Sequence, residues 1–253
     1  MTLLSWFIIG LTIVFGSFLS GVFGMAGGMV VIGVLLVYLD VATAMILFSI
    51  IQFAANGWRA AQWWGFVRWD IIWRYCVGGA IAFGGLRLVK YIPDKAMVYL
   101  LLGLMPFTVE ILPSSWRPNI EWRHVPFVTG LFTTIVQFMA GVGGLFLDIF
   151  FQKSKLDRKT TLATKAVAQS ASHVLRFAYF VSLAGFGVHL EPLPVLVAVA
   201  LAIGGTMLAP YVIERMTDDG FRTWTRFVIL TISIIYLVRA VWLYWHAWFP
   251  AGS

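Results

Sequence analysis

The chain has 253 residues, of which 60% are hydrophobic and only 11% are charged, and its formal net charge is +7. Soluble domains usually carry about 25% charged residues, and one this apolar would expose more hydrophobic surface than water tolerates. The composition therefore excludes a soluble protein and predicts one all-α polytopic membrane domain. Cys76 is the single cysteine, so an intrachain disulfide and CxxC metal motifs are excluded as well.

Hydrophobic runs separated by short charged connections predict about eight transmembrane helices. A spanning helix needs roughly 20 apolar residues, and the runs that suggest one are residues 3–39, 42–63, 71–90, 96–112, 125–151, 161–184, 192–213 and 223–247. The first and fifth runs each contain a cluster of glycines. Because glycine costs about 1 kcal/mol in a helix interior, we expect both of these helices to be broken at the cluster.

Basic residues in the connections suggest an orientation. If each segment crosses once, the connections around Lys90, Lys155 and Arg222 share one side, which the positive-inside rule assigns to the cytoplasm. Both termini would then be periplasmic. The connection with Arg117 and Arg123 does not follow this pattern. A re-entrant turn at each glycine cluster would change the sides.

An internal repeat relates the two halves of the chain. Residues 25–29 align with 141–145, residues 42–44 with 163–165, and residues 84–86 with 204–206. In this register Gln52 falls opposite His173. The alignment predicts two pseudo-symmetric four-helix repeats, residues 1–112 and 125–253, joined by a loop at 113–124. Four full crossings per half would make the repeats parallel, whereas a hairpin at each break would invert them.

Interrupted helices at matching places in two repeats are typical of transporter binding sites. A broken helix frees backbone groups that hydrocarbon cannot satisfy, and the N-terminus of a half-helix attracts anions. The alternative is that the glycines only allow close helix packing. The glycines expected to line a substrate site are Gly24, Gly27, Gly28, Gly141, Gly143 and Gly144.

Polar side chains follow one face of two predicted helices, where they are costly and therefore candidates for function. Helix 161–184 carries a stripe of cationic and hydrogen-bonding groups, typical of an oxyanion site, formed by Lys165, Gln169, Ser172, His173 and Arg176. The matching helix 42–63 carries a neutral stripe of Ser49, Gln52 and Asn56. Snorkelling of Lys165 to the interface and structural hydrogen bonding by the neutral stripe are the alternatives.

Two further charged residues lie near these stripes. We expect Asp148 to pair with a basic residue or to begin a loop rather than to carry a coupling proton, and Arg59 to anchor at the interface. The chain contains no GxSxG, HExxH or Walker motif. We therefore expect no enzymatic activity, no cofactor, no metal and no nucleic acid. Aside from a small anion and the lipid bilayer, a proton or sodium as coupling ion and a homodimer are left open as partners.

Two stretches resemble a known family. The opening run GVFGMAGGMVVIGVLL, followed by the helix that begins ATA, resembles the TauE/SafE membrane proteins, also called the TSUP family. The stretch AGVGGLFLD followed by ATKAVAQSASHVLR resembles the second repeat of that family. The resemblance spans essentially the whole chain. The glycine run of the family is usually denser than here, where Met25 and Ala26 interrupt it.

This resemblance implies a multi-pass protein of the bacterial inner membrane that moves sulfite or organosulfonates. We expect a secondary transporter that binds its anion between the two breaks and works by alternating access. A transporter for another small organic acid, an anion channel, and an intramembrane enzyme are the alternatives. For the enzyme, His173 near Ser170 and Ser172 is the only hint.

Overall fold

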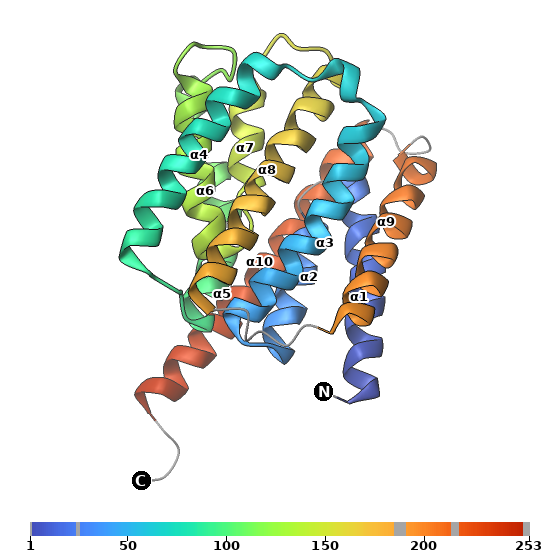
Figure 1. The fold of residues 1–253 in the computed structure, drawn as a ribbon, viewed down its shortest axis with the longest axis vertical. Coiled ribbons are helices and arrows are strands. Elements are labelled where there is room, and N and C mark those ends of the chain that lie inside the picture. The colour runs from blue at the N-terminus through green and yellow to red at the C-terminus, as the bar shows by residue number, and fades with distance from the viewer. Residues whose placement is uncertain (1, 24–25, 185–190, 214–217, 250–253) are drawn as a thin grey trace.

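In the computed structural model, residues 2–23, 26–184, 191–213 and 218–249 are described, and over these residues the chain is all-helical, as predicted. Figure 1 shows the bundle. The described residues form ten α-helices, which are α1 (Leu3–Phe23), α2 (Ala26–Tyr38), α3 (Val41–Gln62), α4 (Trp69–Val89), α5 (Lys95–Ile111), α6 (Val125–Ala140), α7 (Gly144–Phe151), α8 (Arg158–Ala184), α9 (Pro192–Ile213) and α10 (Asp218–Trp248).

Each uninterrupted hydrophobic run forms one helix, and each of the two interrupted runs forms two. Helices α1 and α2 flank residues 24–25, and α6 and α7 flank residues 141–143. Four stretches of the described helices are long and apolar enough to cross a membrane, namely Leu4–Val22, Val41–Gln62, Pro192–Val212 and Thr223–Trp248. The layout of eight spans remains a prediction.

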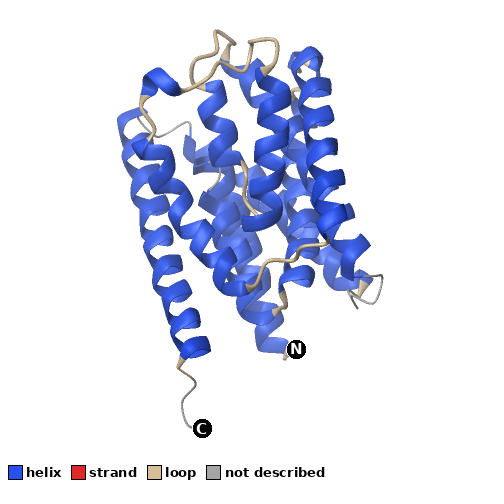
Figure 2. Cartoon of the chain, turned by 90° about the vertical axis from the view of Figure 1, so that its left-hand side faces the viewer, coloured by secondary structure: helices blue, strands red, loops and turns tan. Residues whose placement is uncertain are grey.

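The chain reverses direction at each break. Gly27 of α2 lies against the backbone of Gly16 and Ser20, and Val31 lies beside Gly16, so α1 and α2 run antiparallel. In the second half, Phe146 of α7 packs on Phe132 of α6, with their ring centroids 5.0 Å apart. Figure 1 shows the helices that flank both breaks, and Figure 2 shows that the described elements are helices joined by loops. Both interrupted segments therefore turn back toward the end of the bundle at which they began.

These hairpins change the side on which each connection lies. Tyr179, near the end of α8, donates a hydrogen bond to the carbonyl of Tyr91 (2.7 Å), whereas residues 152–157 precede the start of α8. Because α8 has 27 residues and a helix rises about 1.5 Å per residue, the two connections lie at opposite ends of the bundle. The expectation that the connections around Lys90 and Lys155 share one side is therefore wrong, since it assumed a single crossing at each break.

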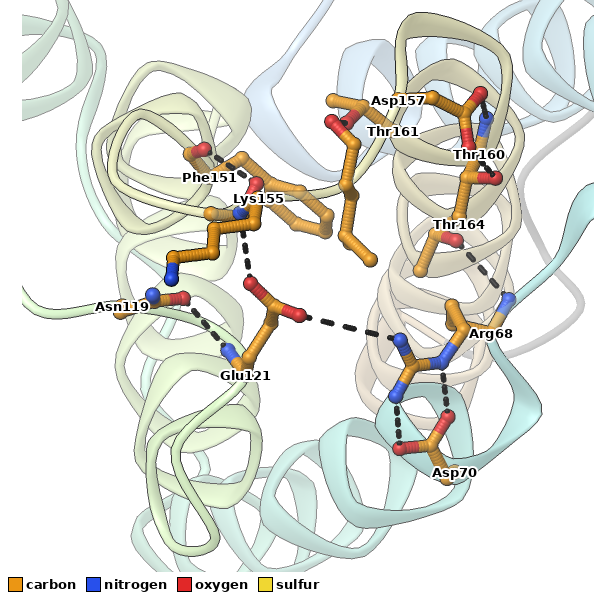
Figure 3. A network of polar contacts seen from close by, with 12 residues as sticks. Arg68, Asp70, Asn119, Glu121, Phe151, Lys155, Asp157, Thr160, Thr161 and Thr164 are labelled. Carbon is orange, nitrogen blue, oxygen red and sulfur yellow. Dashed lines mark hydrogen bonds and ion pairs between the residues drawn. The ribbon is translucent and has the colours of Figure 1, made fainter.

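Connections 63–68, 112–124 and 152–157 gather at one end of the bundle, which we call the basic end. Arg68 forms a fork with Asp70 (2.7 and 2.9 Å) and lies 4.0 Å from Glu121. Glu121 accepts a hydrogen bond from the backbone N–H of Lys155 (2.8 Å), and Thr164 accepts one from that of Arg68 (3.1 Å). Figure 3 shows this network. It ties the three connections together, and the Arg68 guanidinium lowers the pKa of the Asp70 carboxyl.

The two halves of the sequence interleave in space. Helix α1 packs on α9, α4 on α6, α3 on α8, and α5 on α10, so every one of these pairs joins the first half to the second. Glycines let the backbones approach, since an added Cβ at Gly130 would clash with the carbonyl of Tyr75 on α4. The predicted boundaries at 112 and 125 fall in the connection between α5 and α6, but the halves share one core.

Candidate functional site

A cavity of about 1250 Å³ runs from the basic end toward the centre of the bundle, between the two halves. At its mouth lie the exposed side chains of Gln62 and Arg158, and at its floor lie the buried side chains of Phe48 and His173. Nine of the predicted site residues line it, namely Gly28, Gln52, Asn56, Gly141, Gly143, Gly144, Lys165, Gln169 and His173. Both breaks and both polar stripes thus contribute to one cavity.

Glycine has a specific role at each break. Gly141 has φ 79°, a left-handed conformation that ends α6 and that residues with a side chain rarely adopt. Its N–H donates to the carbonyl of Gln137 (2.8 Å). A Cβ added to Gly28 would lie 2.8 Å from Nε2 of Gln52, so this glycine gives the Gln52 amide room beside the start of α2.

His173 and Gln137 form the polar part of the cavity floor. Nε2 of Gln137 lies 2.9 Å from Nδ1 of His173, and both side chains are buried. An amide N–H donates to Nδ1, which leaves the second ring nitrogen, Nε2, to carry the proton of a neutral imidazole. Sequence reasoning missed Gln137, although a glutamine one turn before a glycine break in an apolar segment was a usable signal.

Lys165 is paired within the cavity wall. Its Nζ lies 2.5 Å from Oδ1 of Asp148 on α7. The expected pairing of Asp148 with a basic residue is confirmed. Lys165 also lines the cavity. Its ammonium is therefore both part of the cavity wall and paired with the carboxylate of Asp148.

Arg59 also lines the cavity, and its expected anchoring at the membrane interface stays a prediction. Its guanidinium donates to Oδ1 of Asn56 (3.4 Å) and to the carbonyl of Ser20 at the end of α1 (3.5 Å). Arg59 lies one turn after Asn56 in the neutral stripe of α3, and this spacing was the signal that it shares the same face. It adds a cation to the wall formed by the first half.

Arg176 lies behind the cavity floor and is completely buried. Its Nε donates to Oγ of Ser49 on α3 (2.8 Å), and its Nη1 donates to the carbonyl of Gly141. The guanidinium carbon lies 4.5 Å from the ring centroid of Phe48. Nη2 has no hydrogen-bond partner among the described residues. Arg176 therefore clamps the second break to the first-half helix on the closed side of the cavity.

The remaining predicted site residues that the structure describes do not line this cavity. Gly27 allows the close packing of α2 on α1, which was the alternative interpretation of the glycine clusters. The hydroxyl of Tyr75 lies 2.6 Å from the hydroxyl of Ser172 and 2.8 Å from the hydroxyl of Thr133. Gly24 lies outside the described residues. A role in substrate binding stays a prediction for all of them.

The charge of the cavity suits an anion. Its described lining includes the cationic side chains of Arg59, Arg158, Lys159 and Lys165 and one carboxylate, that of Asp148. A cleft lined by an excess of one charge concentrates ions of opposite sign. In the part of the chain that the structure describes, no three His, Cys, Asp or Glu side chains are grouped so that they could hold a metal ion.

Comparison with known protein families gives a match over residues 8–237 to the family described as sulfite exporter TauE/SafE. Comparisons with curated proteins and with solved structures gave no match. The family match covers most of the chain, and it agrees with the apolar helices and with the resemblance seen in the sequence. This chain is a membrane-embedded member of the TauE/SafE family of transporters.

Proposed function

We propose that this protein is a secondary transporter that moves a small sulfur-containing anion, such as sulfite, thiosulfate or an organosulfonate, across the bacterial inner membrane. The observation that carries the proposal is the cavity, which both helix breaks line and which opens at the basic end. The first turns of α2 and α7 line it through Gly28 and Gly144. Helix N-termini have free N–H groups and a positive dipole end, which favour a bound anion.

The hydrogen-bonding groups at the inner part of the cavity suit an oxyanion. Gln52 on α3, Gln137 on α6, and Gln169 and His173 on α8 can each donate an N–H to it. Lys165 adds a positive charge beside them. The two helices α3 and α8 pack against each other, so a small anion at this point would contact both halves of the protein.

The one-sided opening of the cavity supports alternating access. By the positive-inside rule, the basic end faces the cytoplasm, and the start of α1 and the end of α10 lie at the other end (Figure 1). Helix α6 starts at the basic end, whereas its counterpart α1 starts at the opposite end (Figure 1). Repeats with this opposed orientation can exchange conformations and so open the site to the other side.

Two helix caps suggest the register of these inverted repeats. Asp40 caps α3 by accepting from the N–H of Thr43 (3.0 Å), and Asp157 caps α8 by accepting from that of Thr160 (3.1 Å). Counting from these two aspartates, Gln52 matches Gln169, and Arg59 matches Arg176. The sequence alignment placed the additional residues of the second half before the start of α8, which put Gln52 opposite His173. Counting from the two caps places these additional residues after the start of α8, so the register differs.

The matched arginines support the same mechanism. Arg59 is in the wall of the open cavity, and Arg176 is sealed on the closed side. On exchange of the two conformations, Arg176 would face a cavity on the periplasmic side, and Arg59 would be enclosed. The predicted role of Arg176 in anion binding would then belong to the outward-facing state.

Transport by purified protein in liposomes tests the proposal. We expect sulfite, thiosulfate or methanesulfonate to enter these liposomes in a saturable way. Gly28→Leu should block entry because the new side chain fills the space beside Gln52, whereas Gly57→Leu should not, because a Cβ at Gly57 has no neighbour within 4 Å. No uptake of any of the three anions by wild-type protein would contradict the proposal. Uptake that does not saturate would instead indicate a channel.

A further inference from the structure

The ion pair between Asp148 and Lys165 is placed where a bound anion must disturb it. The two side chains come from α7 and α8 and lie in the cavity wall, with 2.5 Å between Oδ1 and Nζ. They are 37% and 22% exposed, respectively, so both are reachable from the cavity. An anion that binds the Lys165 ammonium therefore competes with a carboxylate that already occupies it.

The surroundings make Asp148 distinctive. Among the described residues, it is the only acidic side chain that lines the cavity, and the titratable or cationic groups that line it with Asp148 are Arg59, Arg158, Lys159, Lys165 and His173. Helices α5 and α6, which pack on α7, contribute no described titratable side chain to the lining. A negative charge added at Lys165 would thus meet one carboxylate at close range.

Charge balance decides how the site can accept this anion. With Lys165 protonated and Asp148 ionised, the empty pair is neutral. Of the other cations in the lining, Arg158 and Lys159 are exposed to water at the mouth, and Arg59 is hydrogen-bonded to Asn56 and Ser20. A bound monoanion would therefore leave a net negative charge on the Asp148–Lys165 pair itself, which is costly away from bulk water. Protonation of Asp148 restores neutrality: the O–H bond forms on the carboxylate, and the ammonium keeps its three protons for the anion. The empty and the loaded pair then carry the same charge.

We infer that Asp148 takes up one proton when an anion displaces it from Lys165, so that anion and proton cross the membrane together. The inference rests on the proposed function and adds its coupling ion. It also departs from the expectation, drawn from sequence, that Asp148 serves only as a partner or begins a loop. One proton per monoanion makes transport electroneutral, and a proton gradient then drives the anion in its own direction.

Proton movement and anion movement can be measured together in liposomes that contain the full chain and a trapped pH-sensitive dye. Methanesulfonate is a suitable probe because it remains a monoanion over the range in which carboxylates and histidine titrate. For wild type, we expect an imposed methanesulfonate gradient to move protons in the same direction. Asp148→Asn should still move methanesulfonate but lose the accompanying protons. Asp157→Asn, which changes an exposed carboxylate outside the cavity, should behave as wild type.

The outcomes separate the inference from the proposed function. Methanesulfonate flux in Asp148→Asn with undiminished proton movement would overturn the inference alone. No flux of sulfite, thiosulfate or methanesulfonate in wild type would overturn the proposed function and this inference with it. A second measurement needs no variant: an imposed membrane potential should leave the wild-type methanesulfonate flux unchanged, and a flux that follows the potential would overturn the inference. Lys165→Gln should raise the KM for methanesulfonate severalfold, since it removes the cation that the anion binds.

Discussion

Helices α3 and α8 start alike, but the two arginines that our proposed repeat register pairs lie in different environments. An aspartate caps each of them, and each puts a glutamine into the cavity, Gln52 from α3 and Gln169 from α8. Arg59 of α3 then lies in the open wall, whereas Arg176 of α8 is fully enclosed and bound to Ser49 and Gly141. In the repeat that we propose, the comparison teaches that one half would face the substrate path while the other half closes it.

The two breaks differ in a related way. The first break allows close helix packing, because Gly27 lets α2 approach α1. The second is built for attachment, because Gly141 adopts a left-handed conformation and offers its carbonyl to Arg176. The second half also supplies Lys165 and His173 to the lining, as the unequal stripes in the sequence led us to expect, and it adds Asp148. Apart from Arg59, the first half contributes neutral groups to the described lining.

The largest expected effect is a difference in stability between variants of the two arginines. Arg176→Ala leaves the hydroxyl of Ser49 and the carbonyl of Gly141 without their donor and opens a void, which should lower the free energy of unfolding by about 2–5 kcal/mol. Arg59→Ala, in the cavity wall, should cost less than about 1 kcal/mol but should raise the KM for the anion. Thermal unfolding in detergent and liposome uptake measure the two effects. Equal stability losses would contradict the assignment of Arg176 to a closed side.

Much of this framework was predictable from the sequence. The apolar runs gave the helices, because hydrocarbon tolerates few other structures, and the glycine clusters gave the breaks. The stripes on α3 and α8 were visible as helical spacing. The family resemblance was confirmed by the match over residues 8–237.

Other features depend on three-dimensional packing. Whether a break continues or reverses the chain depends on which helices cover it, so the sides of the connections could not be deduced from charge alone. Ser172 and His173 are neighbours in sequence, yet Ser172 bonds to Tyr75 and His173 to Gln137, because adjacent helical residues point about 100° apart. The clamp by Arg176 joins residues that are distant in the chain.

An intermediate effect is expected on anion binding when hydrogen-bonding groups of the two halves are removed one at a time. Gln137→Leu removes one donor from the floor and leaves Nδ1 of His173 without a partner, which should cost anion binding about 1–3 kcal/mol. Gln52→Leu, in the first half, should cost anion binding only about 1 kcal/mol, because it leaves no neighbouring side chain without a hydrogen-bond partner. Gln62→Leu at the exposed mouth serves as the control. If the KM for methanesulfonate rises more with Gln52→Leu than with Gln137→Leu, the expectation that the second half contributes more to anion binding is wrong.

The smallest effect concerns the cap of α8. Hydrogen bonds from the side chain and N–H of Thr160 lower the pKa of the Asp157 carboxyl. A folded-state pKa below the unfolded value means that Asp157 stabilises the protein at neutral pH and that this contribution is lost as pH falls through the folded pKa. Asp157→Ala should therefore lower the Tm slightly at neutral pH, and the difference from wild type should shrink in acid. A difference that grows in acid would contradict this role.

The central claim is that the anion binds in the cavity between the two halves, and thiol labelling tests it most directly. Cys76 is the only cysteine, so Cys76→Ser provides a background in which Gln169→Cys places a single thiol in the cavity wall. The rate of its reaction with a membrane-impermeant thiol reagent should fall as the methanesulfonate concentration rises, with half-maximal protection near the KM for uptake by the same Gln169→Cys variant. Labelling that is fast and unaffected by any transported anion would place the binding site elsewhere and contradict the account.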